Sequence, residues 1–206
     1  SFLPRKFKIA VTGSPHDRAA VKVHDIGLRM HRNEAGEIGF EVLVGGGQGR
    51  TPVIAKTIRP FLPKRHLLSY LEAILRIYNQ LGRRDNLYKS RIKILVDSVG
   101  VDRFTQLVEE EWQQMRDGYL DLPVAEIERI RGYFAPPPYR ALDAHVPEYE
   151  GALRRDFRFA RWVRTNVTPH KRPGYAVVTL SLKPTGGIPG DATDAQWAAV
   201  ATTFVA

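Results

Sequence analysis

Residues 26–50 read IGLRMHRNEAGEIGFEVLVGGGQGR. Two segments in which apolar and polar residues alternate, 26–32 and 37–45, flank the turn-rich sequence NEAGE at 33–37. Alternation with a period of two on both sides of such a turn predicts a β-hairpin. We expect this hairpin to belong to the sheet around which the first half of the chain folds.

The second arm of the hairpin runs into a glycine-rich loop, Gly45-Gly46-Gly47-Gln48-Gly49-Arg50. Glycines at such a place let backbone N–H groups approach an anion closely or form an anion-binding nest. The loop fits neither the dinucleotide fingerprint nor the P-loop, because no Gly-Lys-Ser/Thr appears and no helix starts at once. A flexible turn is therefore an equally good interpretation.

Upstream of the hairpin, FLPRKFKIAV (residues 2–11) predicts a further strand over 7–13. Because side chains alternate along a strand, Lys6 and Lys8 should leave the same face. Two like charges on one face repel each other unless an anion or a polar cavity lies beyond them. The alternative is an edge strand whose lysines lie in water and prevent aggregation. Another short strand is predicted over VKVHD (21–25).

Downstream of the hairpin the pattern changes to helical. Apolar residues at helical spacing run from Leu67 to Tyr78, between Pro63 and Gly82. Further helices are predicted over residues 90–99, 101–115 and 123–134. The sequence therefore predicts an α+β fold in which helices pack on a mixed sheet.

Three consecutive prolines, residues 136–138, interrupt the regular pattern. Because such a run favours an extended connector, we expect a domain over residues 1–134, a proline-rich linker over 135–154 and a second domain over 155–206. In the second domain a strand is expected from Tyr175 to Leu182, followed by a helix that begins with Thr193 and Gln196 at capping-box spacing. The buried face of that helix is expected to hold Trp197, Val200, Phe204 and Val205.

The formal net charge of +9 indicates an acidic partner or a polyanionic ligand. The chain has no cysteine, which excludes disulfides, a catalytic thiol and cysteine-ligated metal or iron–sulfur sites within it. Its histidines lack the HxxxH and HExxH spacings, so no metal site is expected. No apolar run approaches the ~20 residues of a membrane span and no signal peptide is evident, so we expect a cytoplasmic protein without a membrane partner.

A basic loop suggests a second class of function. Residues 164–175 carry four basic side chains, and the aromatic residues Trp162 and Tyr175 flank them, which is a weak indication of nucleic-acid stacking. The alternative hypothesis is therefore a free-standing basic module that binds RNA or an acidic protein, with nucleic acid the less favoured of the two. A third hypothesis is a half-domain that folds but binds no cofactor.

Four motifs in order along the chain resemble one family. They are FLPRKFKIAV, VHDIGL, FEVLVGGGQGRTP and IKILVDSVGVDRF, and they resemble siroheme-dependent nitrite and sulfite reductases over residues 2–115. NVTPHKRPGYAVVTLSLKPTGGIPGDATDAQ resembles the ferredoxin-like half-domain of the same family. The resemblance implies an N-terminally truncated siroheme-binding catalytic half-domain followed by an incomplete, C-terminally truncated ferredoxin-like α/β half-domain.

The resemblance also implies a reaction and a set of site residues. In that family siroheme and a 4Fe-4S cluster, which share a cysteine sulfur, carry out the six-electron reduction of sulfite or nitrite with electrons from ferredoxin or a flavoprotein. Lys6 and Lys8 match the lysines that capture the oxyanion and supply protons. Basic residues would meet the siroheme carboxylates, and glycine N–H groups its edge. The residues expected at the cofactor are Arg5, Gly45, Gly46, Gly47, Gln48, Arg50, Arg91 and Lys93.

One departure from the family pattern concerns activity. The cysteines that ligate the cluster in this family are absent here. The chain is therefore expected to be an excerpt of a longer oxidoreductase that is inactive by itself. The motifs do not distinguish sulfite from nitrite as the substrate.

Overall fold

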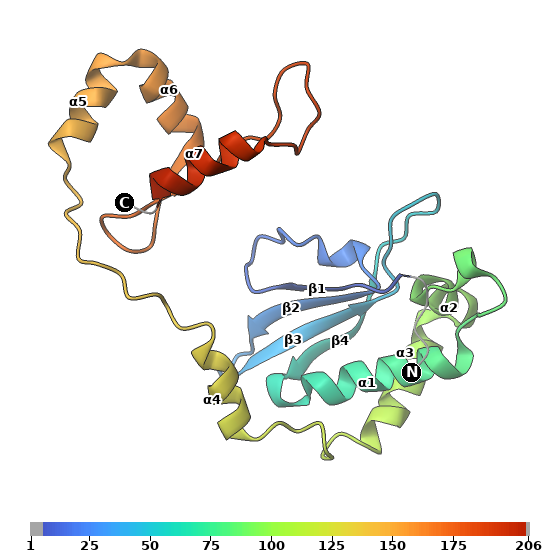
Figure 1. The fold of residues 1–206 in the computed structure, drawn as a ribbon. Coiled ribbons are helices and arrows are strands. Elements are labelled where there is room, and N and C mark those ends of the chain that lie inside the picture. The colour runs from blue at the N-terminus through green and yellow to red at the C-terminus, as the bar shows by residue number, and fades with distance from the viewer. Residues whose placement is uncertain (1–5, 205–206) are drawn as a thin grey trace. The chain divides into compact units, whose positions relative to one another are not determined.

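A mixed four-stranded sheet forms the centre of the first part of the chain (Figure 1). The computed structural model describes residues 6–204, and the chain divides into two compact units, residues 1–134 and 135–206. The strands of the sheet, in spatial order, are β1 (Ile9–Thr12), β2 (Ile26–Arg32), β3 (Ile38–Val44) and β4 (Lys56–Pro63). The β1–β2 pair is parallel and the other pairs are antiparallel, which confirms the predicted α+β class with a mixed sheet.

The predicted hairpin is formed by β2 and β3. Their register runs from Ile26 opposite Val44 to Arg32 opposite Ile38. In the turn, the Asn33 side chain accepts a hydrogen bond from the Glu37 N–H at 2.9 Å, as expected for an asparagine that organises a turn.

The strands differ from the sequence expectation in two places. β4 was not predicted, because Pro60 and Pro63 lower the strand propensity of its sequence; its position at an edge of the sheet is where prolines are tolerated. VKVHD does not form a strand, since Val21–Val23 is the 3-10 helix η1. The carboxylate of Asp17 accepts a hydrogen bond from the Val21 N–H and so favours the turn over an extended backbone.

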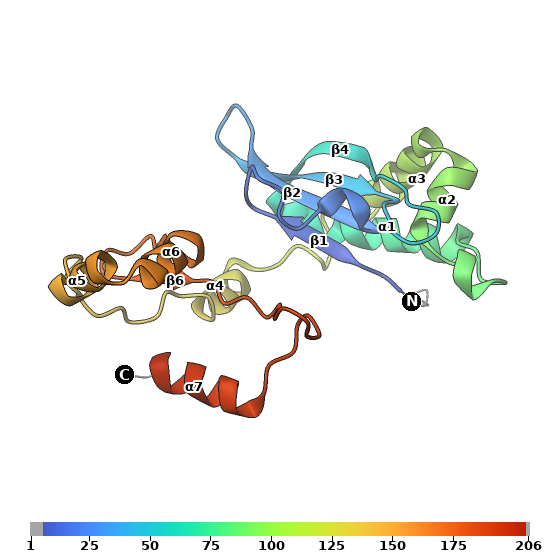
Figure 2. The ribbon, with the colours of Figure 1, turned by 90° about the horizontal axis from the view of Figure 1, so that it is seen from above.

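The helices of the first unit lie close to their predicted positions. They are α1 (Leu67–Leu81), α2 (Ile92–Val99), α3 (Val101–Gln113) and α4 (Val124–Gly132). The short 3-10 helix η2 (Lys64–His66) directly precedes α1, and η3 (Leu87–Lys89) lies between α1 and α2. Figures 1 and 2 show α1 running along the sheet with α2 and α3 beside it. Tyr70, Ile74 and Tyr78 of α1 are fully buried in one core with the inward side chains of β2 and β3.

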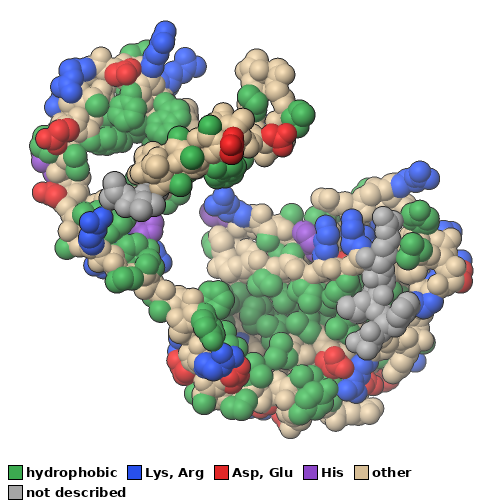
Figure 3. All heavy atoms as spheres, viewed as in Figure 1, with side chains coloured by type: hydrophobic (Ala, Val, Ile, Leu, Met, Phe, Trp, Pro, Cys, Tyr) green, Lys and Arg blue, Asp and Glu red, His purple; other side chains and the backbone are tan. Residues whose placement is uncertain are grey.

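Apolar side chains are also exposed on the helix-covered side of the sheet. In the register of β1 and β2, Ile9 and Val11 lie beside the buried Ile26 and Leu28, yet 43% and 54% of their surface is exposed. Figure 3 shows apolar side chains gathered over this part of the first unit.

Within residues 6–204, no helix is long and apolar enough to cross a membrane.

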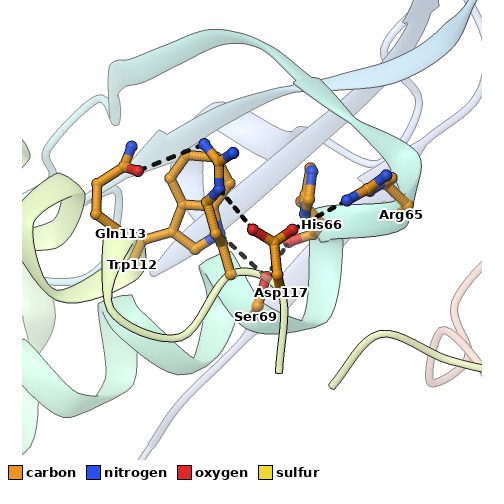
Figure 4. A network of polar contacts seen from close by, with 7 residues as sticks. Arg65, His66, Ser69, Trp112, Gln113 and Asp117 are labelled. Carbon is orange, nitrogen blue, oxygen red and sulfur yellow. Dashed lines mark hydrogen bonds and ion pairs between the residues drawn. The ribbon is translucent and has the colours of Figure 1, made fainter. Parts of the chain in front are cut away.

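A buried polar network joins α1 to α3 (Figure 4). The Trp112 indole N–H donates to Ser69 Oγ at 3.0 Å, and this hydroxyl donates to the carbonyl of His66 at 3.0 Å. Nearby, Glu109 accepts hydrogen bonds from Tyr70 and Arg59, each at 2.7 Å. Burial and the Glu109 hydrogen bond raise the pKa of Tyr70 well above its ordinary value.

The second unit carries little buried surface. Its elements are α5 (Pro147–Arg155), α6 (Phe157–Asn166), β5 (Val167–Pro169), β6 (Ala176–Val178) and α7 (Asp194–Phe204). Helix α5 occupies part of the segment expected to be linker, and the strand expected over 175–182 is shortened to β6. Among the described residues of this unit, Gly151 alone is buried, because a two-stranded sheet covers little apolar surface.

The capping box predicted for the last helix is present. The Thr193 N–H donates to Gln196 Oε1 at 2.9 Å, and the Gln196 N–H donates to Thr193 Oγ1 at 3.2 Å. The expected buried face of α7 is not formed as predicted, since Trp197 is 55% exposed and Val200 only half-buried. Val205 and the side chain of Phe204 lie outside the described residues.

Candidate functional site

The motifs singled out in the sequence converge at one end of the sheet. β1 and β2 begin at this end, β3 ends there, and α2 starts beside them (Figure 1). This arrangement follows from the topology. Two parallel strands begin at the same end of a sheet, and an antiparallel neighbour ends there. The segment before β1, the glycine-rich loop after β3 and the start of α2 are thereby brought together.

Asp25 connects these three segments. Its carboxylate is fully buried and accepts hydrogen bonds from Nε and one terminal nitrogen of Arg91, both at 2.8 Å. The same carboxylate accepts the Lys8 backbone N–H at 3.0 Å, and the Asp25 carbonyl accepts the Gly45 N–H at 3.0 Å. A two-pronged arginine pair of this kind is both strong and directional, so it fixes the relative positions of the segments.

Sequence reasoning did not identify Asp25 as a site residue. The available signal was an acidic side chain directly before a strand that begins with the buried Ile26. Its neighbour His24 does not pair with it, because His24 Nδ1 lies 2.9 Å from the carbonyl of Ala20.

The glycine-rich loop is shaped by close packing against its neighbours. A Cβ atom added to Gly46 would lie 2.5 Å from the Lys22 carbonyl oxygen, so only glycine fits there. Gly47 and Val53 exchange backbone hydrogen bonds of 2.9 and 2.8 Å, which close residues 48–52 into an exposed tongue. The N–H groups of Gly45 and Gly47 are therefore engaged within the chain.

Lys93 and Arg91, at the start of α2, pack against this loop on its buried side. Lys93 is 8% exposed, and its ammonium group donates to the backbone carbonyls of Thr51 and Gln48. Arg91 is bonded to Asp25 and lies against Gly47. The structure thus brings these two predicted residues to the loop, with hydrogen bonds directed into the protein.

Lys6 and Lys8 precede β1, which begins at Ile9, so they lie outside the strand in which they were expected. Both are exposed, whereas Phe7 between them packs against the core. The Lys8 carbonyl continues the hydrogen bonding of β1 with β2, because it accepts the Ile26 N–H at 3.1 Å. The Lys8 N–H donates instead to the side chain of Asp25. Arg5 lies outside the described residues.

The surface that results is cationic. Lys6, Lys8 and Arg50 are exposed at this end of the sheet together with Gln48, and the carboxylate within the cluster, Asp25, is neutralised by Arg91. Exposed ammonium and guanidinium groups beside a glycine tongue can attract an anion and donate hydrogen bonds or protons to it.

The basic loop of the second unit is organised differently. Tyr175, one of its two flanking aromatics, packs edge-on against Tyr139 with ring centres 5.0 Å apart and donates a hydrogen bond to the Arg140 carbonyl at 3.2 Å. The other flanking residue, Trp162, is 39% exposed. Trp162 also stacks with Phe159, with ring centres 6.4 Å apart, so both rings considered for nucleic-acid stacking are engaged in local packing.

Residues 1–115 match the family described as nitrite and sulphite reductase 4Fe-4S domain. A sulfite reductase (ferredoxin) from Synechococcus elongatus is 34% identical over 149 residues, which are 69% of this chain and 22% of that protein. A sulfite reductase (NADPH) hemoprotein beta-component from Staphylococcus haemolyticus is 36% identical over 112 residues, 51% of this chain and 19% of that protein. The chain therefore spans only a small part of the length of these relatives.

A solved structure supports the fold. The Mycobacterium tuberculosis NirA protein is similar over 68% of this chain and 23% of its own, with a TM-score of 0.50 and 23% sequence identity. The family match includes the sheet, the glycine-rich loop and the start of α2, because all of them lie within residues 1–115.

Proposed function

The chain belongs to the nitrite and sulphite reductase 4Fe-4S domain family, and we propose from this premise that it forms the siroheme- and substrate-facing part of a sulfite or nitrite reductase. One observation carries the proposal: Lys6 and Lys8 are exposed, and the buried Asp25 bonds both the Lys8 backbone N–H and the N–H of Gly45, where the glycine-rich loop begins. A pair of cations fixed through the backbone suits a small oxyanion better than a flexible surface patch does.

The residues present fit a polycarboxylate such as siroheme. Gln48 and Arg50 are exposed on the tongue, and Gly46 packs so closely against the Lys22 carbonyl oxygen that no side chain fits at that position. Arg91 and Lys93 contribute by holding the loop, with their positive charges beneath it. We propose that Arg50, with Arg5 from the segment before the described residues, binds carboxylates of the macrocycle.

Siroheme with its cluster supplies the electrons for reducing the bound oxyanion. The chain's own contribution is electrostatic and acid–base: the ammonium groups of Lys6 and Lys8 attract the anion, orient it and donate protons as its oxygen atoms leave as water. Because the chain has no cysteine, the ligands of a 4Fe-4S cluster must come from other residues than these. We propose that the chain by itself is inactive and that the electron donor of the intact reductase is ferredoxin or a flavoprotein.

The proposal is tested on the native-length protein isolated from its source cells. We expect it to show siroheme absorption and to oxidise reduced methyl viologen when sulfite or nitrite is added. The 206-residue chain alone, used as the control, should show no turnover. A native-length protein without siroheme, or one that reduces neither oxyanion, would contradict the proposed function.

A further inference from the structure

The position of the two lysines is set by the backbone of residue 8. The side chains of Lys6 and Lys8 are exposed, so packing does not fix them. The backbone is fixed by two hydrogen bonds to the start of β2: the Lys8 carbonyl accepts the Ile26 N–H, and the Lys8 N–H donates to Asp25. Phe7, packed on the core, fixes the alternation that exposes both neighbours.

The Asp25 side chain accepts a hydrogen bond that a backbone carbonyl of a paired strand would normally accept. A backbone N–H at the start of an edge strand needs an acceptor, and here the acceptor is a carboxylate oxygen rather than a backbone carbonyl. A carboxylate can accept from Lys8 and from both Arg91 nitrogens at once, since it has no donor hydrogen. An amide of the same shape would turn an NH₂ group towards one of these donors.

We propose that Asp25, with Arg91 as its counter-ion, is a positioning residue that holds Lys6 and Lys8 at the oxyanion. This inference rests on the proposed function, because it assigns a role to Asp25 in the same site. Asp25 acts through the lysine backbone and does not itself touch the substrate. Arg91 pairs with the buried carboxylate and, from the start of α2, ties the lysine segment to the glycine-rich loop.

The first readout is amide hydrogen exchange of the native-length protein, resolved at Lys8 by fragmentation mass spectrometry. Asp25→Asn should accelerate exchange of the Lys8 amide about tenfold or more relative to the amides of β3, because a charge-assisted hydrogen bond is lost. This readout does not depend on bound siroheme or on activity.

The second readout separates positioning from folding. In Asp25→Asn we expect kcat/KM for the oxyanion to fall about tenfold to a hundredfold with a raised KM, because displaced lysines bind the anion poorly. A purely structural defect would lower the active fraction, and with it kcat, while leaving KM unchanged.

Two further variants keep the test decisive. If Asp25→Asn does not fold, Asp25→Ala combined with Arg91→Met removes both charges of the buried pair, a change that proteins often tolerate, and the same two effects are expected. Glu109→Gln is the matched control, since Glu109 also accepts from an arginine and a second donor but is remote from the lysine segment. It should leave Lys8 exchange, after correction for global stability, and KM at their wild-type values.

The outcomes distinguish this inference from the proposed function. Lys8→Ala removes the ammonium group but keeps the N–H that Asp25 holds. If Lys8→Ala loses activity while Asp25→Asn shows unchanged Lys8 exchange or an unchanged KM, the positioning role is overturned and the reductase site stands. If Lys8→Ala is fully active, the proposed role of the lysines falls, whatever Asp25 does.

Discussion

Two carboxylates of the first unit have the same kind of partners and serve different parts of the fold. Asp25 is fully buried and binds Arg91 and a backbone N–H, whereas Glu109, with a side chain 25% exposed, binds Arg59 and the Tyr70 hydroxyl. The partners of Glu109 lie between α1, α3 and β4, inside the packing of the helices on the sheet. The partners of Asp25 lie next to exposed lysines and a glycine tongue. A buried ion pair is informative about function only through what it holds in place.

The largest expected difference between the two clusters is in stability. Arg91→Ala leaves the Asp25 carboxylate buried without its counter-ion, so the free energy of unfolding should fall by about 3–5 kcal/mol. Arg59→Ala should cost about 2 kcal/mol, because Glu109 keeps the Tyr70 hydrogen bond and partial access to water. Denaturant unfolding of the two variants measures both values. Equal losses would show that the two carboxylates are equivalent.

A second prediction concerns the glycine-rich loop. Gly46→Ala places a Cβ against the carbonyl oxygens of Lys22 and His24, at 2.5 and 2.6 Å, and backbone atoms cannot give way as flexible side chains do. We expect a loss of about 1–3 kcal/mol in the free energy of unfolding. The control is Gly132→Ala at the end of α4, where a Cβ would meet no atom within 4 Å. If both variants are as stable as the wild type, the close packing of the loop is not confirmed.

The smallest effect appears only at alkaline pH, in the Glu109 cluster. The pKa of Tyr70 is raised in the folded state from a normal value of about 10. Above pH 10 the unfolded chain therefore loses a proton that the folded chain keeps, and the free energy of unfolding falls by about 1.4 kcal/mol at pH 11. Tyr70→Phe should lack this part of the pH dependence. If the free energy of unfolding changes with pH in the same way for both proteins between pH 9 and about 11, the burial argument is contradicted.

The parts of the fold that sequence predicted are those set by local patterns. The alternation around NEAGE located β2 and β3, the apolar stripe from Leu67 to Tyr78 located α1, and Thr193 with Gln196 marked the start of α7. β4 was missed because its prolines contradict strand propensity and only its edge position makes them acceptable. In the second unit, the apolar pattern of α7 predicts a buried face, but the two-stranded sheet is too small to cover it.

The candidate site was predictable only in its components. The spacing of Lys6 and Lys8 and the glycine run stood out in the sequence, but their link did not. Asp25 and Arg91 are 66 residues apart, and no local pattern shows that they pair. The same limit applies to Lys93, whose buried hydrogen bonds to the loop depend on how α2 packs.

The account is tested most directly by turnover of the native-length protein with Lys8→Ala, compared with Lys64→Ala, which removes an exposed lysine at the start of η2. A positioned acid–base group typically contributes ~10²–10⁴ to the rate, so kcat/KM for sulfite or nitrite should fall at least about a hundredfold in Lys8→Ala. Lys64→Ala should retain wild-type turnover. If Lys8→Ala stays within about threefold of the wild type, far below that range, Lys8 is a surface lysine and the proposed site is wrong.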